Sequence, residues 1–343
     1  MSKPQAKRLG FFTRVLDEVG PAERYRMATD QIVAAEANGF DSAWIAQHHF
    51  HEFEGGMPSP FVFLNYVAAK TSTIRLGTAI ITLPLENAIR VAEDAIVLDT
   101  MSGGRFEFGV GTGGTPSSFV SFGLVSDQRA TIFAENYKTV RDAWSGEAFA
   151  GGDRLYPDGR PLLDRCWQAT FSAGGGARAG TFGDGLMLSK TQPRPKDNPK
   201  ATLSEMQHPI IDAYLENLPE GRAPRIMGSR TLFVADNYEL AMRYAEEGIA
   251  RHLERNPGMR PSAGSTLAEW IPNMDICVGT PESVLEDLKA DTALERTTEM
   301  VFQVHPIEPP HEAILRSIEL IAEKVAPALG WAGPANAKRS AAE

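Results

Sequence analysis

The stretch NGFDSAWIAQHHF, residues 38–50, holds the end of a helix, a short apolar strand and a polar strand end in close succession. The helical stretch Pro21–Asn38 stops before Gly39, which matches the usual preference for proline at the start of a helix and glycine just past its end. Asp41–Ala46 reads as a buried strand, and polar side chains follow it at once. A helix, a buried strand and polar residues directly after that strand are typical of parallel α/β folds.

Working outward, the same alternation of strands and helices runs along most of the chain. About eight strand–helix units predict a TIM (β/α)8 barrel with loop insertions at its C-terminal face. A doubly wound open sheet is the rival, because short apolar strands look alike in both folds. The predicted strands are Leu9–Thr13, Asp41–Ala46, Ile74–Thr82, Arg105–Gly111, Trp167–Thr170, Leu186–Ser189, Ile226–Val234 and Met300–Val304. The predicted helices are Pro21–Asn38, Ser59–Lys70, Ala88–Met101, Gln128–Trp144, Ala177–Phe182, Glu205–Leu218, Asn237–Glu254 and Ala313–Lys324.

The composition is that of a water-soluble enzyme-sized protein. The chain has 343 residues and a formal net charge of −10, which gives it no general attraction for nucleic acid or anionic lipid. It has 2 cysteines, which excludes a disulfide-rich scaffold and suits a reducing cytoplasm. No apolar run approaches the roughly 18 residues of a membrane helix, and the first residues lack a signal-peptide core. We therefore expect a cytoplasmic protein with neither nucleic-acid nor membrane partners.

The alternation predicts one domain, residues 1–330, followed by a flexible tail, residues 331–343. Three segments interrupt the pattern with many Gly, Pro or charged residues: 146–165, 190–204 and 255–275. Long insertions in a barrel are often lids over the active site, but inert surface loops are equally compatible with these sequences.

Functional side chains of a barrel follow the C-terminal ends of its strands. After the second strand, Gln47 and His48 place an amide beside an imidazole, which can accept or donate a proton near neutral pH. His49, His51 and Glu52 offer an alternative metal site, but no second cluster of ligands appears, so we predict no metal. A structural histidine pair packed under a loop is a further alternative.

The fourth predicted strand runs into GVGTGG, residues 109–114, which satisfies the G-x-G-x-x-G pattern of dinucleotide sites. The pattern lies on a late strand, and Glu135, the acidic residue at the expected distance, falls inside a helical stretch. We therefore expect these glycines to permit a close approach to a flat ligand or a tight turn.

After the fifth strand, Ser172 precedes Gly174 and Gly175 at the start of a helix. Free N–H groups at a helix start together with a hydroxyl form a natural phosphate site. An N-cap with a flexible turn is the alternative. Lys190 and Arg194 are nearby cations for an anionic ligand, although loop lysines are commonly just solvated.

Taken together, these segments resemble the bacterial luciferase-like, flavin-dependent monooxygenases, over roughly Lys7 to Gly330. The match is carried by residues 38–50 and by the stretches IRLGTAIITLP (74–84), AED (92–94), LDTMSGGRFEFGVG (98–111) and VGTPE (278–282). The combination is specific to the superfamily and much less specific to a reaction.

The resemblance implies a TIM barrel that binds reduced FMN at its C-terminal face and uses O2 to oxygenate a small organic substrate. It further implies a separate flavin reductase as partner, and a homodimer, for which the helices after strands two and three are the expected interface. His48 matches the catalytic histidine of the family, a general base or a stabiliser of the oxygenated flavin. Ala79 and Ile80 match a pair joined by a cis peptide beneath the flavin ring, and Ser172, Gly174 and Gly175 match the segment that holds the flavin phosphate.

Three departures from the family pattern concern the same site. Gln47 stands where relatives usually have glutamate, Thr112 where many have a phosphate-binding arginine, and Gly111 where luciferase has a reactive cysteine. Lys190 or Arg194 would then supply the missing positive charge. A deazaflavin-dependent hydride-transfer enzyme and a non-catalytic flavin-binding protein are the alternatives.

Overall fold

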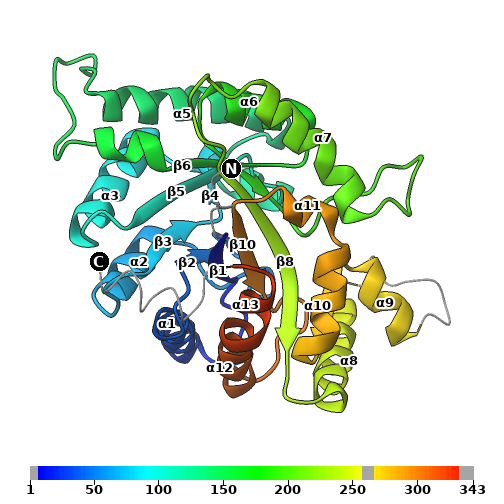
Figure 1. Ribbon diagram of the computed structural model, residues 1–343. Helices are drawn as coiled ribbons and strands as arrows, with labels where there is room; N and C mark the ends of the chain where they lie inside the picture. The colour runs from blue at the N-terminus through cyan, green and yellow to red at the C-terminus, as the bar shows by residue number, and fades with distance from the viewer. Residues whose placement is uncertain (1–6, 257–265, 332–343) are drawn as a thin grey trace.

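The computed structural model describes residues 7–256 and 266–331, and its parallel strands close into a barrel (Figure 1). Eight strands form the ring β10-β1-β2-β3-β5-β6-β7-β8, and β8 pairs with β10 to close it. The predicted TIM barrel is confirmed, and the doubly wound alternative is wrong because an open sheet has no such closing pair. The strands are β1 (Arg8–Thr13), β2 (Ser42–Ile45), β3 (Arg75–Thr78), β4 (Ile81–Thr82), β5 (Phe106–Gly111), β6 (Cys166–Thr170), β7 (Gly185–Leu188), β8 (Ile226–Val234), β9 (Ile276–Gly279) and β10 (Glu299–Gln303).

Helices cover the outside of the ring, as Figure 1 shows. They are α1 (Pro21–Ala37), α2 (Pro60–Ala68), α3 (Ala88–Met101), α4 (Pro116–Ser121), α5 (Arg129–Ser145), α6 (Ala173–Thr181), α7 (Leu203–Glu216), α8 (Tyr238–Arg255), α9 (Leu267–Asn273), α10 (Pro281–Ala290), α11 (Thr292–Glu295), α12 (His311–Leu320) and α13 (Ala326–Ala328). Short 3-10 turns span Leu83–Leu85, Ser126–Gln128 and Arg160–Arg165, and a π-helical turn, Ile321–Val325, joins α12 to α13. None of the helices in the described part of the chain combines the length and apolarity that crossing a membrane requires.

The helix boundaries follow from local side-chain chemistry. Asn87 caps α3 by accepting hydrogen bonds from the N–H groups of Ile89 and Arg90. Thr202 and Glu205 form a reciprocal capping box at the start of α7. Such caps satisfy backbone donors that the first helical turn leaves free, and so they fix where the chain turns from loop to helix.

Two tryptophans fill the lower part of the barrel. Trp44 on β2 and Trp167 on β6 meet edge to face with ring centroids 5.6 Å apart. Gly77 faces the ring of Trp44, and a Cβ added there would lie 2.2 Å from it, so only glycine leaves room. The indole N–H of Trp167 donates to buried Glu107 at 2.8 Å, and that of Trp44 donates to buried Glu299 at 3.0 Å. The two indoles and the buried carboxylates thus fill part of the barrel interior.

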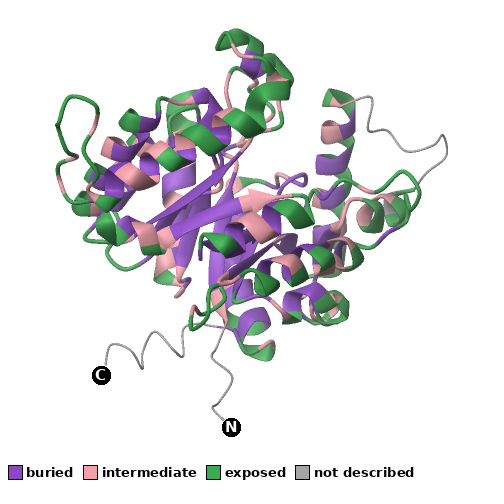
Figure 2. Cartoon of the chain, turned by 90° about the horizontal axis from the view of Figure 1, so that it is seen from above, coloured by how far each residue is buried: buried purple, intermediate pink, exposed green. Residues whose placement is uncertain are grey.

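The apolar core lies between the ring and its helices. In Figure 2 the strands are buried, whereas the outward faces of the surrounding helices are exposed. Alternation along β1 explains this layering, since Leu9 and Phe11 pack in the outer core and Phe12 points into the barrel. The side chains of Cys166 and Cys277 are both buried free thiols.

The structure departs from the sequence predictions in several places. Helix α6 begins at Ala173 instead of the predicted Ala177, and the short helices α4, α9 and α11 were not predicted. The single strand expected over Ile74–Thr82 is two strands, because a cis peptide between Ala79 and Ile80 interrupts it. Strand β9, with helix α10 after it, was not predicted; it pairs with β8 outside the ring.

Trp331, the first residue of the predicted tail, is buried against Phe302 and bridges to Lys7. Residues 332–343 lie outside the described residues, as do residues 257–265 of the third insertion.

Candidate active site

The C-terminal mouth of the barrel has an apolar floor made of Ala79, Ile80, Gly111 and Ala169. All but Gly111 pack on the cluster of side chains inside the barrel. A Cβ added to Gly111 would lie 2.5 Å from Cδ1 of Ile80 and 3.7 Å from Cβ of Ala169, so these residues meet over the missing side chain. The bond between Ala79 and Ile80 is cis, as the family resemblance implied. The floor is apolar, which suits the face of a planar ring.

The glycine-rich segment 109–114 forms part of this floor, and it does not form the phosphate-binding turn of a dinucleotide site. A Cβ on Gly109 would lie 1.9 Å from the carbonyl oxygen of Thr78, so glycine lets β5 approach β3 closely. Gly113 has a φ of +73° and faces Thr82. Thr112 continues the chain from Gly111, and the short helix α4 begins only at Pro116. Gly113 thus fits the expected tight turn, whereas the close approach to a flat ligand stays a prediction.

Gln47 holds the broken strand in place through both ends of its side-chain amide. Its Nε2 donates to Oε1 of Glu86 at 2.6 Å and to the carbonyl of Pro58 at 3.2 Å, while its Oε1 accepts from the N–H of Thr82 at 2.8 Å. Its backbone N–H donates to the carbonyl of Ile80 at 3.3 Å. The side chain of Gln47 is buried and fully occupied, so its contacts are those of a residue that positions the floor.

His48 lies beside the floor and contacts two side chains of opposite charge. Nη2 of Arg14 is 3.4 Å from Nε2 of His48, and Oε2 of Glu54 is 3.7 Å from its Nδ1. A guanidinium can only donate, so this geometry makes Nε2 the acceptor and leaves the ring proton on Nδ1, towards Glu54. Burial lowers the pKa of His48; Glu54 opposes this shift and the charge of Arg14 adds to it. His48 is therefore a neutral imidazole at neutral pH, which is the form a proton acceptor requires.

Ser172, Gly174 and Gly175, together with Thr170, form a cradle at the start of α6. The hydroxyl of Ser172 caps the helix by accepting from the N–H of Gly175 at 3.2 Å, and Oγ1 of Thr170 accepts from the N–H of Ser172 at 3.1 Å. A Cβ on Gly175 would lie 1.9 Å from Oγ1 of Thr170, whereas one on Gly174 would meet nothing within 4 Å. Gly174 and Ser172 are exposed, so the positive end of this helix is open to an anion.

Lys190 lies in a different group from the cradle. Its side chain is buried, and Nζ donates to the carbonyl of His305 at 2.8 Å, to which Thr231 also donates. Arg194 forms an ion pair with Asp275, with distances of 2.8 and 2.9 Å to its two carboxylate oxygens. Neither of these cations contacts Ser172, although the sequence suggested both as partners of an anion there.

Buried Lys190 and His305 lie together with half-buried His252 and Glu308 in what we call the ionic cluster. Nδ1 of His305 lies 2.7 Å from Oε1 of Glu308, and the rings of His252 and His305 meet edge to face at 5.1 Å. Burial lowers the pKa of Lys190 to about 7 and raises the pKa of Glu308 to about 7. Burial also lowers the pKa of His252 to about 4 and that of His305 well below its ordinary value. Desolvation thus disfavours the charged form of every member.

Sequence reasoning did not identify Arg14, Glu54, Gln303, His305 or Glu308. Arg14 directly follows β1, and Gln303 ends β10, so both satisfy the rule that functional residues of a barrel follow its strands. We applied that rule only to strands that end in histidine or glycine motifs. Applied to every strand, it identifies Arg14 and Gln303. Within the described part of the chain, no three His, Cys, Asp or Glu side chains gather closely enough to hold a metal ion.

The chain is similar in sequence to a family of known proteins. Residues 9–297 match the model of a family described as luciferase-like monooxygenase. The chain is 27% identical over 336 residues to a 4-hydroxyprotoasukamycin monooxygenase from Streptomyces nodosus subsp. asukaensis, which covers 89% of this chain and 90% of that protein.

Two solved structures share the fold. The oxygenating constituent of 3,6-diketocamphane monooxygenase from the CAM plasmid of Pseudomonas putida, in complex with FMN, superimposes with a TM-score of 0.74 at 19% identity, over 94% of this chain and 99% of that one. The coenzyme F420-dependent tetrahydromethanopterin reductase from Methanopyrus kandleri gives a TM-score of 0.67 at 17% identity, with the same coverage of both chains.

Proposed function

Because the chain belongs to the luciferase-like monooxygenase family, we propose that it is an FMN-dependent monooxygenase acting on a small organic substrate. In this reaction reduced FMN, O2 and the substrate give oxidised FMN, a product with one added oxygen atom, and water. Bound FMN would supply the electrons that activate O2, and the protein would supply position, acid–base groups and exclusion of water. The observation that carries the proposal is the apolar floor beside an open helix N-terminus at one barrel mouth.

The residues of the mouth fit the two ends of FMN. The floor of Ala79, Ile80 and Gly111 would offer an apolar surface to the flavin ring. Ser172, Gly174 and Gly175 offer the hydroxyl and the helix N-terminus that suit a phosphate. Thr112 brings a hydroxyl and no positive charge, so in this proposal the phosphate is held mainly by neutral donors.

His48 would act as a proton acceptor at the same site. Its neutral ring points Nε2 towards Arg14 and the mouth, and its Nδ1 proton towards Glu54. Gln47 would act through the floor, by fixing Thr82 and Ile80, and not by proton transfer, because an amide does not titrate.

The partners in this proposal follow from the chemistry. FMN has to arrive reduced, so a separate flavin reductase would feed the enzyme. The helices after the second and third strands present exposed apolar side chains, among them Val62 and Tyr66 on α2 and Val97 and Met101 on α3. Exposed apolar side chains on adjacent helices favour the homodimer expected from the family resemblance.

A deazaflavin-dependent hydride-transfer enzyme is the second candidate, supported by the fold shared with the F420-dependent reductase. The long acidic tail of a deazaflavin would need free cations, and the basic insertion 190–200 is the segment that would supply them. Two of the four cations there are occupied, since Lys190 is buried against His305 and Arg194 pairs with Asp275. This observation favours FMN over the deazaflavin.

The proposal is tested by supplying the protein with reduced FMN, a flavin reductase and 18O2, and searching a substrate panel for labelled product by mass spectrometry. We expect one 18O atom per product molecule. We also expect the His48→Gln variant to lose turnover by about a hundredfold while it retains FMN binding. His51→Gln changes a half-buried neighbour whose Nε2 lies 2.9 Å from Oγ of Ser117; it is the control and should keep full activity.

Tight FMN binding without any O2-dependent product would instead support a non-catalytic flavin-binding protein. Product formation with a reduced deazaflavin and no need for O2 would support hydride transfer. Either result would contradict the monooxygenase.

A further inference from the structure

Glu54 lies in the loop that follows His48, and this loop encloses the imidazole ring. The N–H of Glu54 donates to the carbonyl of His51 at 3.0 Å, which turns the chain back towards His48. A Cβ added to Gly55 would lie 2.5 Å from Cδ2 of the ring, so only glycine leaves room for the imidazole there. The N–H of His48 donates to the carbonyl of Met57 at 3.0 Å. The loop that carries Glu54 therefore packs directly on the ring.

One carboxylate oxygen of Glu54 faces both His48 and Thr115. Oε2 lies 3.7 Å from Nδ1 of His48 and accepts from the hydroxyl of Thr115 at 3.0 Å. Thr115 is the N-cap residue of α4, but its hydroxyl caps no N–H group of that helix. Threonine at an N-cap ordinarily bonds to the helix, so here its hydroxyl is diverted to the carboxylate. Glu54 is thus held by the segment that follows β5 as well as by its own loop.

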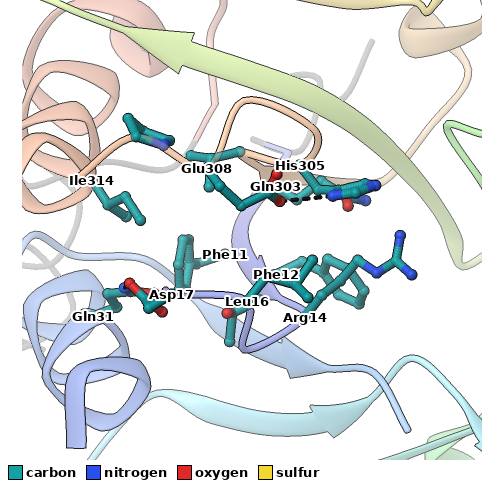
Figure 3. A pocket seen from close by; sticks show the side chains of 13 residues that line it. Phe11, Phe12, Arg14, Leu16, Asp17, Gln31, Gln303, His305, Glu308 and Ile314 are labelled. Atoms are coloured by element: carbon teal, nitrogen blue, oxygen red, sulfur yellow. Dashed lines mark hydrogen bonds and ion pairs between the residues drawn. The ribbon is translucent and has the colours of Figure 1, made fainter. Parts of the chain in front are cut away.

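Arg14 approaches the other ring nitrogen of His48. Its Nη2 lies 3.4 Å from Nε2 of the ring and also donates to the carbonyl of Glu54. Figure 3 shows the guanidinium of Arg14 directed away from Asp17 and Gln31, which line the opposite end of a small pocket between β1 and β10. The imidazole therefore lies between a guanidinium at Nε2 and a carboxylate at Nδ1.

These two charges act on the ring in opposite senses. A carboxylate favours the positively charged imidazolium, whereas a guanidinium disfavours it. Burial lowers the pKa of His48, Glu54 raises it, and Arg14 lowers it again. Three other titratable side chains interact with the ring: His49, His51 and His305. A positive charge on any of these three would lower the pKa of His48 further, so among all these groups it is Glu54 that favours the charged ring.

We propose that Glu54 is the positioning residue of His48: its carboxylate keeps the imidazole proton on Nδ1 and balances the positive charge that the ring gains when Nε2 accepts a proton. The N–H bond at Nδ1 stays intact in this step. A new N–H bond forms at Nε2 as the donor, hydronium in a titration, loses its proton, and Nη2 of Arg14 turns away from Nε2. A carboxylate beside one ring nitrogen holds a histidine in one tautomer and stabilises its charged form in this way. The use of His48 as a proton acceptor rests on the function proposed above, whereas its pairing with Glu54 rests on the geometry.

The test is a pH titration by 1H–15N NMR of the full-length protein with 15N label in its 7 histidines. The His48→Gln variant identifies the signals of His48, and the 15N shifts of the neutral ring report which nitrogen carries the proton. We expect the proton on Nδ1. Glu54→Gln should lower the pKa of His48 by about 0.5 to 1, and Glu54→Asp should lower it less because the charge is kept. Arg14→Met should raise the pKa of His48 by a similar amount, about 0.5 to 1.

Glu52→Gln is the matched control, because Glu52 lies in the same loop but pairs with Arg24 at 3.2 Å, and its loss should leave the pKa of His48 unchanged. A cooperative thermal transition establishes that each variant is folded, and Glu54→Gln tests the proposal alone if Arg14→Met fails to fold. The proposal is overturned if the neutral ring carries its proton on Nε2, or if Glu54→Gln changes the pKa of His48 no more than the control does. The titration needs neither FMN nor turnover, so failure to bind FMN contradicts the proposed function and leaves this pairing standing.

Discussion

Gln47 and His48 are neighbours in the sequence, but their side chains make different contacts. His48 meets Arg14 and Glu54 at the mouth, whereas Gln47 bonds to Glu86 and Thr82 behind the floor. The sequence predicted the pair as one catalytic unit because both follow β2. Their separation depends on partners that lie far along the chain, and such contacts leave no local pattern.

The Gln47→Glu substitution, towards the residue that relatives usually have, should destabilise this protein. A carboxylate would replace the amide that donates to Glu86, whose pKa burial already raises. The folded protein would then bind a proton more tightly than the unfolded chain does, so the loss grows as the pH rises. We expect a loss of about 2 kcal/mol at pH 8 in urea unfolding, shrinking below about pH 5.

The double variant Gln47→Glu with Glu86→Gln restores this hydrogen bond with its direction reversed, because the amide at position 86 would donate to the carboxylate at position 47. It should recover most of the lost free energy of unfolding at pH 8. A double variant that is less stable than the single one would show that this hydrogen bond does not decide the residue at position 47.

At the scale of elements, periodic segments were predictable and interruptions were not. Helix α3, Ala88–Met101, has the predicted bounds, because its apolar stripe and its Asn87 cap are both local signals. The break between β3 and β4 lies in the uniformly apolar run Ile74–Thr82, where periodicity cannot mark a boundary. Strand β9 is short and lies outside the ring, so no eightfold pattern required it.

The turn from β6 into α6 requires glycine at position 175 and tolerates a side chain at position 174. Gly175→Ala would bring a Cβ against the hydroxyl of Thr170, which itself holds Ser172. We expect thermal or urea unfolding to report a loss of about 1–3 kcal/mol. Gly174→Ala has free space around the new Cβ and is the matched control. Equal stability of the two variants would contradict the geometry described for the cradle.

At the scale of the whole molecule, the exposed apolar side chains of α2 and α3 make a testable surface. Val62 is 71% exposed and Met101 69% exposed. If this surface pairs two copies of the chain, the Val62→Glu and Met101→Glu double variant should sediment as a monomer at concentrations where the unmodified protein is a dimer. Val120→Glu changes an equally exposed valine on α4 and should leave the mass unchanged. A dimer that survives the double variant would place the interface elsewhere.

The half-buried His252 should make the whole fold sensitive to acid. The folded-state pKa of His252 is about 4, below its ordinary value, so the unfolded chain binds more protons between about pH 6.5 and 4. Stability therefore falls as the pH falls through this range. The raised pKa of Glu308 makes the protein more stable as the pH falls, which is the opposite effect. Because Glu308 is present in both the unmodified protein and a His252→Gln variant, its effect cancels when the two are compared.

The comparison of these two proteins isolates the contribution of His252. Between pH 7 and 4.5 the unmodified protein should lose on the order of 1 kcal/mol more free energy of unfolding than His252→Gln does. Urea unfolding at both pH values measures this difference, and identical losses would contradict the burial of His252 as a neutral ring.

The barrel as a whole was predictable from the count of about eight strand–helix units, although the strands alone did not exclude a doubly wound sheet. The chemistry at its mouth was only partly predictable. Ala79, Ile80 and Gly111, assigned from resemblance, do meet in space, and Ser172, Gly174 and Gly175 do form one helix start. Lys190 was expected as a partner for an anion, and its burial against His305 depends on the closure of the ring, which brings β7 and β10 residues together.

The central claim, that this barrel mouth binds FMN for oxygenation, is tested most directly by titrating the protein with reduced FMN, oxidised FMN and a deazaflavin. We predict that reduced FMN binds most tightly. We also predict that Ser172→Ala weakens its binding by about tenfold, while Ser145→Ala, at the far end of α5, has no effect. Preference for the deazaflavin, or failure to bind any flavin, would contradict the claim.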